Sequence, residues 1–285
     1  MKKTIIAATC IAALMAISCA KESTAGLKDD SPREIVLGMD TGELDFNVTK
    51  ASEITSLPSS LYWSGTTGTA GTSETSKVGS ASATLSSSKI ATGIYQTKTP
   101  TAYNWYVANS AITFATAGST VTVDGTSLDA IAGVAKANST TAPSVTLKHI
   151  FARIGTLTCN TQSGYTISNI SWKIKGNENK AGTKGTYNIA NETWGSTATT
   201  QLTSETAISA NWDTYLIPGS YKCFVTYTLT KGDYTDTFTK SGNVTLDGGK
   251  KNNLSCTAIG GSAQEIQISC TLTGWGSVDK TITLE

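Results

Sequence analysis

The chain has 285 residues, of which 39% are hydrophobic and 15% are charged, and its formal net charge is +1. This balance excludes the clustered basic surface of a nucleic-acid-binding protein, so we expect no nucleic-acid partner. The chain contains one histidine, His149. A single imidazole argues against histidine-based metal sites and histidine-dependent catalytic triads, and we expect no metal and no cofactor.

A secretion signal occupies the start of the chain. Two lysines follow the first methionine, and a mostly apolar run extends from Ile5 to Ile17. This run is too short for a permanent membrane helix, which needs about 20 apolar residues, but it has the length of a secretory hydrophobic segment. Small residues stand close before Cys19, at the end of the run. Residues 1–18 therefore resemble a bacterial lipoprotein signal.

In lipoproteins of this kind a peptidase cuts before the cysteine, which becomes an acylated, palmitate-bearing N-terminus. The resemblance implies that Cys19 is lipidated and that residues 19–33 form a flexible tether. It also implies an anchor in the outer membrane and exposure at the cell surface, because several acyl chains hold a protein stably at a membrane. The alternative is an ordinary signal peptide with an incidental cysteine.

Alternation of apolar and polar residues indicates β-strands along most of the remaining chain. Turn-forming residues separate these segments, as at Asp124-Gly125 and Asp247-Gly248-Gly249. No long stretch has a convincing helical stripe, and many short strands at this spacing predict an all-β protein of β-sandwich architecture. The clearest strand segments are Leu44 to Val48, Tyr103 to Val107, Tyr221 to Leu229 and Ile266 to Leu272.

Two regions depart from simple alternation. Residues 64–88 are rich in serine, threonine and glycine, and they are either a flexible loop or threonine-rich strands. Within residues 144–159 the apolar phase changes twice, which requires a bulge or a bend. We predict a bulge near Gly155 and a crossing between domains near Pro143, at the end of a linker-like segment. The predicted domains are residues 34–143 and residues 144–285.

Four cysteines lie beyond the signal: Cys159, Cys223, Cys256 and Cys270. Their spacing does not suggest a zinc site. After export they could form one or two disulfides. The apolar strand positions of Cys223 and Cys270 favour free thiols that behave as small hydrophobic residues, and the sequence leaves the disulfide state open.

Several segments, taken in order, resemble the fimbrillin family, whose members are subunits of lipoprotein-derived (type V) pili. These segments are EIVLGM with FNVTKA, then VTLKHIFARIGTL, YKCFVTYTLT, GNVTLDGGKKNNL and LTGWGSV. The resemblance implies two tandem Greek-key, transthyretin-like β-sandwich domains. It also implies a non-enzymatic role in a fimbrium or in cell adhesion, with other pilus subunits as partners and possible ligands on host or bacterial surfaces.

The resemblance further implies assembly by strand exchange after a protease cuts behind a basic residue near the N-terminus. The candidates are Lys50, whose cleavage would release Ile35 to Val48, and Arg33, whose cleavage would remove no strand. Lys50 departs from the family's usual arginine, and each residue could instead be a solvated surface cation. The last segment, WGSVDKTITLE, could donate the exchanged strand or simply close its own domain.

An alternative function is glycan binding by a monomeric outer-membrane lipoprotein. Trp194 and Trp212 occur in polar, turn-rich contexts, and exposed indole rings there could stack on sugars. Trp105, in contrast, lies in an alternating apolar segment and is expected in the core. The carboxylates are scattered and no pair suggests a glycosidase, so we expect no catalytic residues and no enzyme activity.

Overall fold

The protein is all-β, as the alternation predicts. The computed structural model describes residues 32–42, 44, 56–96, 99–177, 181–195, 200–210, 214–261, 266–274 and 282–283. Every regular element among these residues is a β-strand. The described part of the chain contains no helix that is long and apolar enough to cross a membrane.

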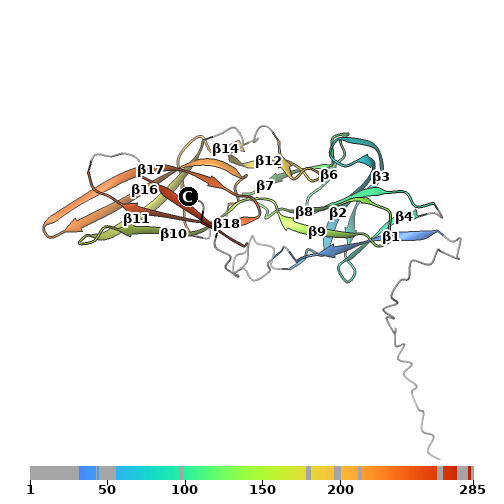
Figure 1. The fold of residues 1–285 in the computed structure, drawn as a ribbon, viewed down its shortest axis with the longest axis horizontal. Coiled ribbons are helices and arrows are strands. Elements are labelled where there is room, and N and C mark those ends of the chain that lie inside the picture. The colour runs from blue at the N-terminus through green and yellow to red at the C-terminus, as the bar shows by residue number, and fades with distance from the viewer. Residues whose placement is uncertain are drawn as a thin grey trace, which may run out of the picture.

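A seven-stranded sheet forms one end of the elongated molecule (Figure 1). The low-complexity residues 64–88 contribute to two paired strands of this sheet, so the threonine-rich strand interpretation is the correct one. In spatial order the sheet contains β3 (Ser73–Thr84), β2 (Ser60–Thr69), β5 (Tyr103–Ala108), β8 (Ile131–Asn138), β9 (Ser144–His149), β1 (Arg33–Asp40) and β4 (Lys89–Gln96). Its buried residues form one core, which includes Trp63, Trp105 and Leu147.

A second sheet packs on the face of β5 and β8 that points away from the first core. It contains β13 (Thr193–Trp194), β12 (Gly182–Asn188), β7 (Thr120–Asp124) and β6 (Ile112–Thr113), and β14 (Thr200–Gln201) also pairs with β12. The central pair, β7 and β12, is antiparallel and places Lys184 opposite Asp124. These two strands come from opposite halves of the sequence, so the halves share a sheet. A middle core, which includes Tyr106 and Tyr187, fills the space beneath it.

The remaining strands form a sandwich of two four-stranded sheets at the other end of the molecule. One sheet contains β10 (Arg153–Thr161), β18 (Lys250–Ala258), β19 (Ile268–Gly274) and β20 (Ile282–Thr283). The other contains β15 (Thr206–Ile208), β11 (Thr166–Gly176), β16 (Gly219–Lys231) and β17 (Tyr234–Leu246). A third core, which includes Trp172, Tyr221 and Leu254, lies between them. The register of β10 shifts between Ile154 and Leu157, which confirms the predicted bulge near Gly155.

The chain leaves the first sheet later than expected. We predicted a crossing near Pro143, but the next strand, β9, pairs with both β8 and β1. Val145 and Leu147 of β9 are fully buried in the core of the first sheet. Their partner β1 lies about a hundred residues earlier, so local alternation could not assign β9 to that sheet. The crossing to the C-terminal sandwich follows His149.

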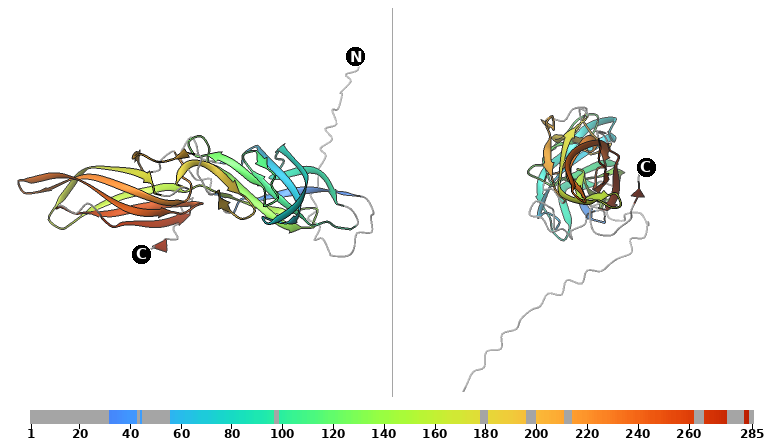
Figure 2. Two further views of the ribbon diagram at one scale, coloured as in Figure 1. Left: turned by 90° about the horizontal axis from the view of Figure 1, so that it is seen from above. Right: turned by 90° about the vertical axis from the view of Figure 1, so that its left-hand side faces the viewer.

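The three cores follow one another along the long axis of the molecule. The strands of the first sheet lie at one end, and the β16–β17 hairpin projects at the other (Figures 1 and 2). The view along the axis shows a narrow cross-section (Figure 2). The last strand, β20, lies at the end of the C-terminal sandwich that is nearer the middle of the molecule (Figure 2). The protein is therefore rod-shaped.

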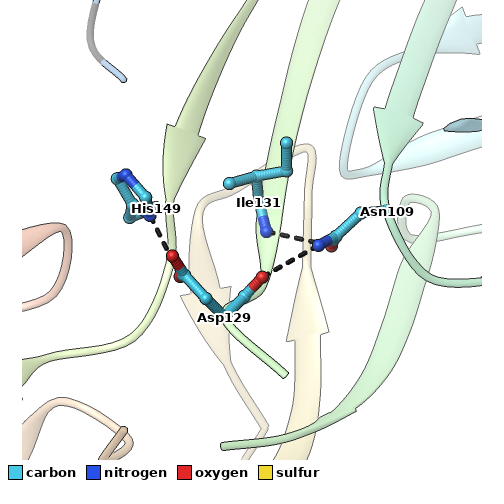
Figure 3. Close-up of polar contacts among 4 residues, drawn as sticks. All are labelled: Asn109, Asp129, Ile131 and His149. Atoms are coloured by element: carbon cyan, nitrogen blue, oxygen red, sulfur yellow. Dashed lines mark hydrogen bonds and ion pairs between the residues drawn. The ribbon is translucent and has the colours of Figure 1, made fainter. Parts of the chain in front are cut away.

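A buried polar network joins the end of β9 to the segment before β8 (Figure 3). Nδ1 of His149 lies 3.0 Å from Oδ1 of Asp129, and these residues are only 3% and 0% exposed. Nδ2 of Asn109 donates to the backbone carbonyl of Asp129 at 2.8 Å, and the backbone N–H of Ile131 donates to Oδ1 of Asn109 at 3.0 Å. The network holds together the strands that lead out of the first sheet.

Replacing Asp129 with alanine should lower the free energy of unfolding by about 3 kcal/mol, because His149 would stay buried without its carboxylate partner. Urea denaturation measures the change. Asp233→Ala, in the exposed turn between β16 and β17, is the control and should change stability by less than about 0.5 kcal/mol. Equal effects of the two substitutions would contradict a structural role for the pair.

Candidate functional site

The N-terminal strand β1 fills a gap between β9 and β4, and we call this gap the β1 slot. On one side β1 runs parallel to β9, with Met39 opposite Val145. On the other side it runs antiparallel to β4, with Leu37 opposite Ile90. Two parallel neighbours need a long connection. Here the connection runs from β1, the first strand of the fold, to β9, which follows much later in the chain. Strand β1 therefore lies between β9 and β4, and β4, at the edge of the sheet, has no other ladder partner among the described strands.

The side chains of β1 alternate strictly between the core and the outer face. Ile35 and Leu37 are 0% exposed and Met39 is 9% exposed, whereas Val36 and Gly38 are half-buried on the opposite face. At about 1.5–3 kcal/mol for each fully buried apolar side chain, the three inward residues contribute roughly 5–9 kcal/mol. The floor of the slot is thus an apolar surface that needs a strand to cover it.

The backbone of β1 is hydrogen-bonded on both sides, and the N–H groups of Val36 and Gly38 also donate to the carbonyls of Thr141 and Pro143, just before β9, at 2.9 Å each. Only residues 38–40 pair in register with β9, and the register with β4 shifts between Glu34 and Val36. Side chains replace part of the ladder at this bulge. The hydroxyl of Thr92 donates to the carbonyl of Ile35 at 2.8 Å, and the N–H of Gly93 donates to Oε1 of Glu34 at 2.8 Å. Backbone hydrogen bonds on both sides and apolar burial on one face together hold β1 in place.

The two candidate cleavage sites differ in their position relative to β1. Arg33 is the exposed first residue of β1 and pairs with Gln96, so a cut behind it would leave nearly all of the strand attached. Lys50 lies outside the described residues, as does Cys19. In the sequence Lys50 lies between β1 and β2. A cut there would therefore separate β1 from the rest of the chain.

The C-terminal strand β20 lies at the edge of a sheet. Among the described strands it pairs with β19 alone, with Ile282 opposite Leu272 and Thr283 opposite Thr271. In this structure β20 pairs within its own domain. Because an edge strand has a neighbour on one side only, β20 can leave without separating two other strands.

Of the two candidate glycan residues, Trp194 is not a fully exposed ring. Trp194 is half-buried, and its ring centroid lies 5.0 Å from that of Phe151 and 5.3 Å from that of Tyr187. Its polar sequence context hid this packing, because Phe151 lies far away along the chain. Trp212 lies outside the described residues.

A different aromatic group is exposed at the far end of the rod. Tyr234 is 50% exposed, and Nζ of Lys231 lies 4.9 Å from the ring centroid of Tyr165. Together with Gln162 they line an open hollow of about 370 Å³. These residues come from the β10–β11 turn and the β16–β17 turn, and only the fold brings them together. No three His, Cys, Asp or Glu side chains among the described residues form a group that could hold a metal ion.

Comparison with known proteins identifies a shared fold. No protein-family model matches the sequence, and no curated protein matches it. A solved structure of a fimbrial protein from Bacteroides vulgatus is 14% identical, has a TM-score of 0.54 and covers 86% of this chain and 100% of its own. A candidate cell adhesion protein from Parabacteroides distasonis is 12% identical, has a TM-score of 0.50 and covers 88% of this chain and 99% of its own. The present chain has the β-sandwich fold of these structures.

Replacing Leu37 with alanine should lower the free energy of unfolding by about 2–5 kcal/mol, because a cavity would open between β1 and the apolar floor of its slot. Val36→Ala, on the opposite face of the same strand, is the matched control and should cost less than about 1.5 kcal/mol. Thermal or urea denaturation measures both. If the Val36 substitution were the more damaging one, the inward burial of β1 would be refuted.

Proposed function

We propose that this chain is the lipoprotein precursor of a fimbrillin-type pilus subunit or surface adhesin, with a structural rather than an enzymatic role. The observation that carries the proposal is the β1 slot, an apolar gap between two strands that is filled by the first strand of the fold. The fold shared with a fimbrial protein and with a candidate cell adhesion protein supports it. Its partners are other pilus subunits and the outer membrane.

In the proposed pathway, acyl chains on Cys19 first tether the precursor to the outer membrane, at the cell surface. A protease then cuts behind Lys50. While the chain is intact, residues 41–59 link β1 to β2, and the high effective concentration of the tethered strand keeps it in the slot. Cleavage removes this advantage, because a released strand can diffuse away.

The vacated slot would then accept a strand from a neighbouring subunit. Backbone groups of β4 and β9 supply the hydrogen bonds of strand addition, and pockets for alternate side chains supply specificity. The C-terminal segment WGSVDKTITLE offers Ile282 and Leu284 in alternation. Its strand β20 can detach from one edge without opening a sheet, which suits it to be the donor.

Because residue 50 is a lysine, the position of this subunit in a filament depends on the specificity of the protease. A protease specific for arginine would leave Lys50 intact, and β1 would remain in its slot. Such a subunit could donate a strand but could not accept one. It would then act as an anchor or as a terminal subunit.

Lys50→Ala should abolish detergent-resistant ladders of the surface protein on gels, because β1 could no longer leave. Mass spectrometry of the N-terminus should find a start at Ala51 in the unaltered protein and at acylated Cys19 in the variant. Arg33→Ala is the matched control and should leave both the ladder and the start unchanged. A Lys50→Ala protein that still forms ladders would overturn the proposed processing step.

A second candidate function is glycan binding at the far end of the rod, favoured by the exposed ring of Tyr234 and the neighbouring Lys231 and Tyr165. On glycan arrays Tyr234→Ala should weaken binding about 10-fold, the loss expected for one stacking contact. Tyr95 is equally exposed on β4 at 54%, and Tyr95→Ala should leave binding unchanged. Equal loss in both variants, or no binding by the unaltered protein, would reject this function.

A further inference from the structure

Two thiols of the C-terminal sandwich are in contact across neighbouring strands. Cys159 on β10 and Cys256 on β18 are directly opposite in the parallel register, and their Sγ atoms lie 3.4 Å apart. The preceding inward pair, Leu157 and Leu254, packs with the same core. Both sulfur atoms therefore lie on the inner face of one sheet and face each other.

The backbone geometry at this pair suits a disulfide. Disulfide-linked residues have Cα atoms about 4.4–6.8 Å apart, and paired residues on adjacent strands are separated by about 4.7–4.9 Å. The sulfur atoms of Cys159 and Cys256, now 3.4 Å apart, must approach by about 1.4 Å to reach bonding distance. Side-chain rotation can supply this movement, because the two strands are already adjacent.

The thiol pKa values distinguish the pair Cys159 and Cys256 from the pair Cys223 and Cys270. A hydrogen bond from the Cys256 thiol lowers the pKa of Cys159, which is half-buried, and the same bond raises the pKa of Cys256. Burial raises the pKa of both Cys223 and Cys270 to about 12. The thiolate is the attacking species in thiol–disulfide exchange. Cys159 is therefore the thiol that reacts first, whereas Cys223 and Cys270 stay reduced.

We propose that Cys159 and Cys256 form a disulfide in the exported protein, an inference that rests on the export step of the proposed function. Exported proteins meet oxidising conditions in which disulfides form and persist. The oxidant is an external disulfide, carried by a thiol oxidoreductase or by a small molecule.

The reaction proceeds by two exchange steps. The Cys159 thiolate attacks the external disulfide, forms a mixed disulfide and releases one external thiolate. Cys256 then loses its proton to solvent or to that thiolate, and its sulfur attacks Sγ of Cys159 and expels the second external thiolate. Two protein thiols are oxidised, one external disulfide is reduced to two thiols, and no other reactant is needed.

The bond would change how the protein carries a pulling force. In a filament held by exchanged strands, force enters through the first sheet and leaves through the C-terminal segment. A bond between Cys159 and Cys256, which are 97 residues apart in sequence, would pass this force directly from β10 to β18. Strands β11 to β17 would lie in a closed loop that does not extend.

Peptide mapping without reduction tests the bond directly. Protein harvested from the cell surface is unfolded, alkylated and digested without reduction, and a purified sample treated with oxidised glutathione is handled in parallel. We expect one cross-link between the peptides that carry Cys159 and Cys256, with Cys223 and Cys270 alkylated after unfolding. Alkylation of all four cysteines in either sample would overturn the proposal. If all four cysteines were alkylated but the protein still formed normal ladders, the disulfide proposal would fail and the proposed function would stand.

Single-molecule pulling tests the mechanical consequence on the same protein. When the C-terminal sandwich unfolds, oxidised protein should extend by about 34 nm less than reduced protein, since 97 residues stay closed at about 3.5 Å each. Cys159→Ser should give the longer extension under both conditions. Cys270→Ser, in the same sheet, should keep the difference. Equal extensions of oxidised and reduced protein would contradict the proposed clamp.

Discussion

Burial of one face of β1 between β9 and β4 is the interaction on which the rest of this structure depends. Ile35, Leu37 and Met39 complete the core of the first sheet, yet they belong to a strand that precedes the body of the fold. Its backbone is hydrogen-bonded to β4 through a bulged ladder and, on the other side, to β9 and the residues just before it. In the proposed assembly, a strand with the same alternation from a neighbouring subunit would take the place of β1 and cover the same apolar surface.

The contacts that join the parts of the rod lie away from β1. Pairing of β7 with β12 joins the two halves of the sequence in one sheet, and the middle core lies on the opposite side of β5 and β8 from the slot. The pair of Asp129 and His149 fixes the crossing between the first sheet and the C-terminal sandwich. The rod thus combines β1, the strand that would leave in the proposed assembly, with a middle sheet that joins the two halves of the sequence.

The sequence predicted the all-β class, the bulge near Gly155 and the strand character of many segments, because alternation is a local signal. It could not assign β9 to the first sheet, since its partner β1 is distant in the chain. The packing of Trp194 on Phe151 and the meeting of Tyr165 with Lys231 also depend on contacts between remote segments. For the same reason spacing alone could not pair Cys159 with Cys256. Strand exchange near the N-terminus was expected only from the family resemblance, and the topology shows which strands lie on either side of β1.

The most direct measurement of the central claim is amide hydrogen exchange along β4 and β9. The protein is compared intact, after cleavage behind Lys50 and removal of the β1 peptide, and after addition of a peptide spanning residues 275–285. The account predicts protected amides, then exposed amides, then restored protection in β4 and β9, with β16 and β17 protected throughout. Unchanged protection after β1 is removed, or no restoration by the added peptide, would contradict it.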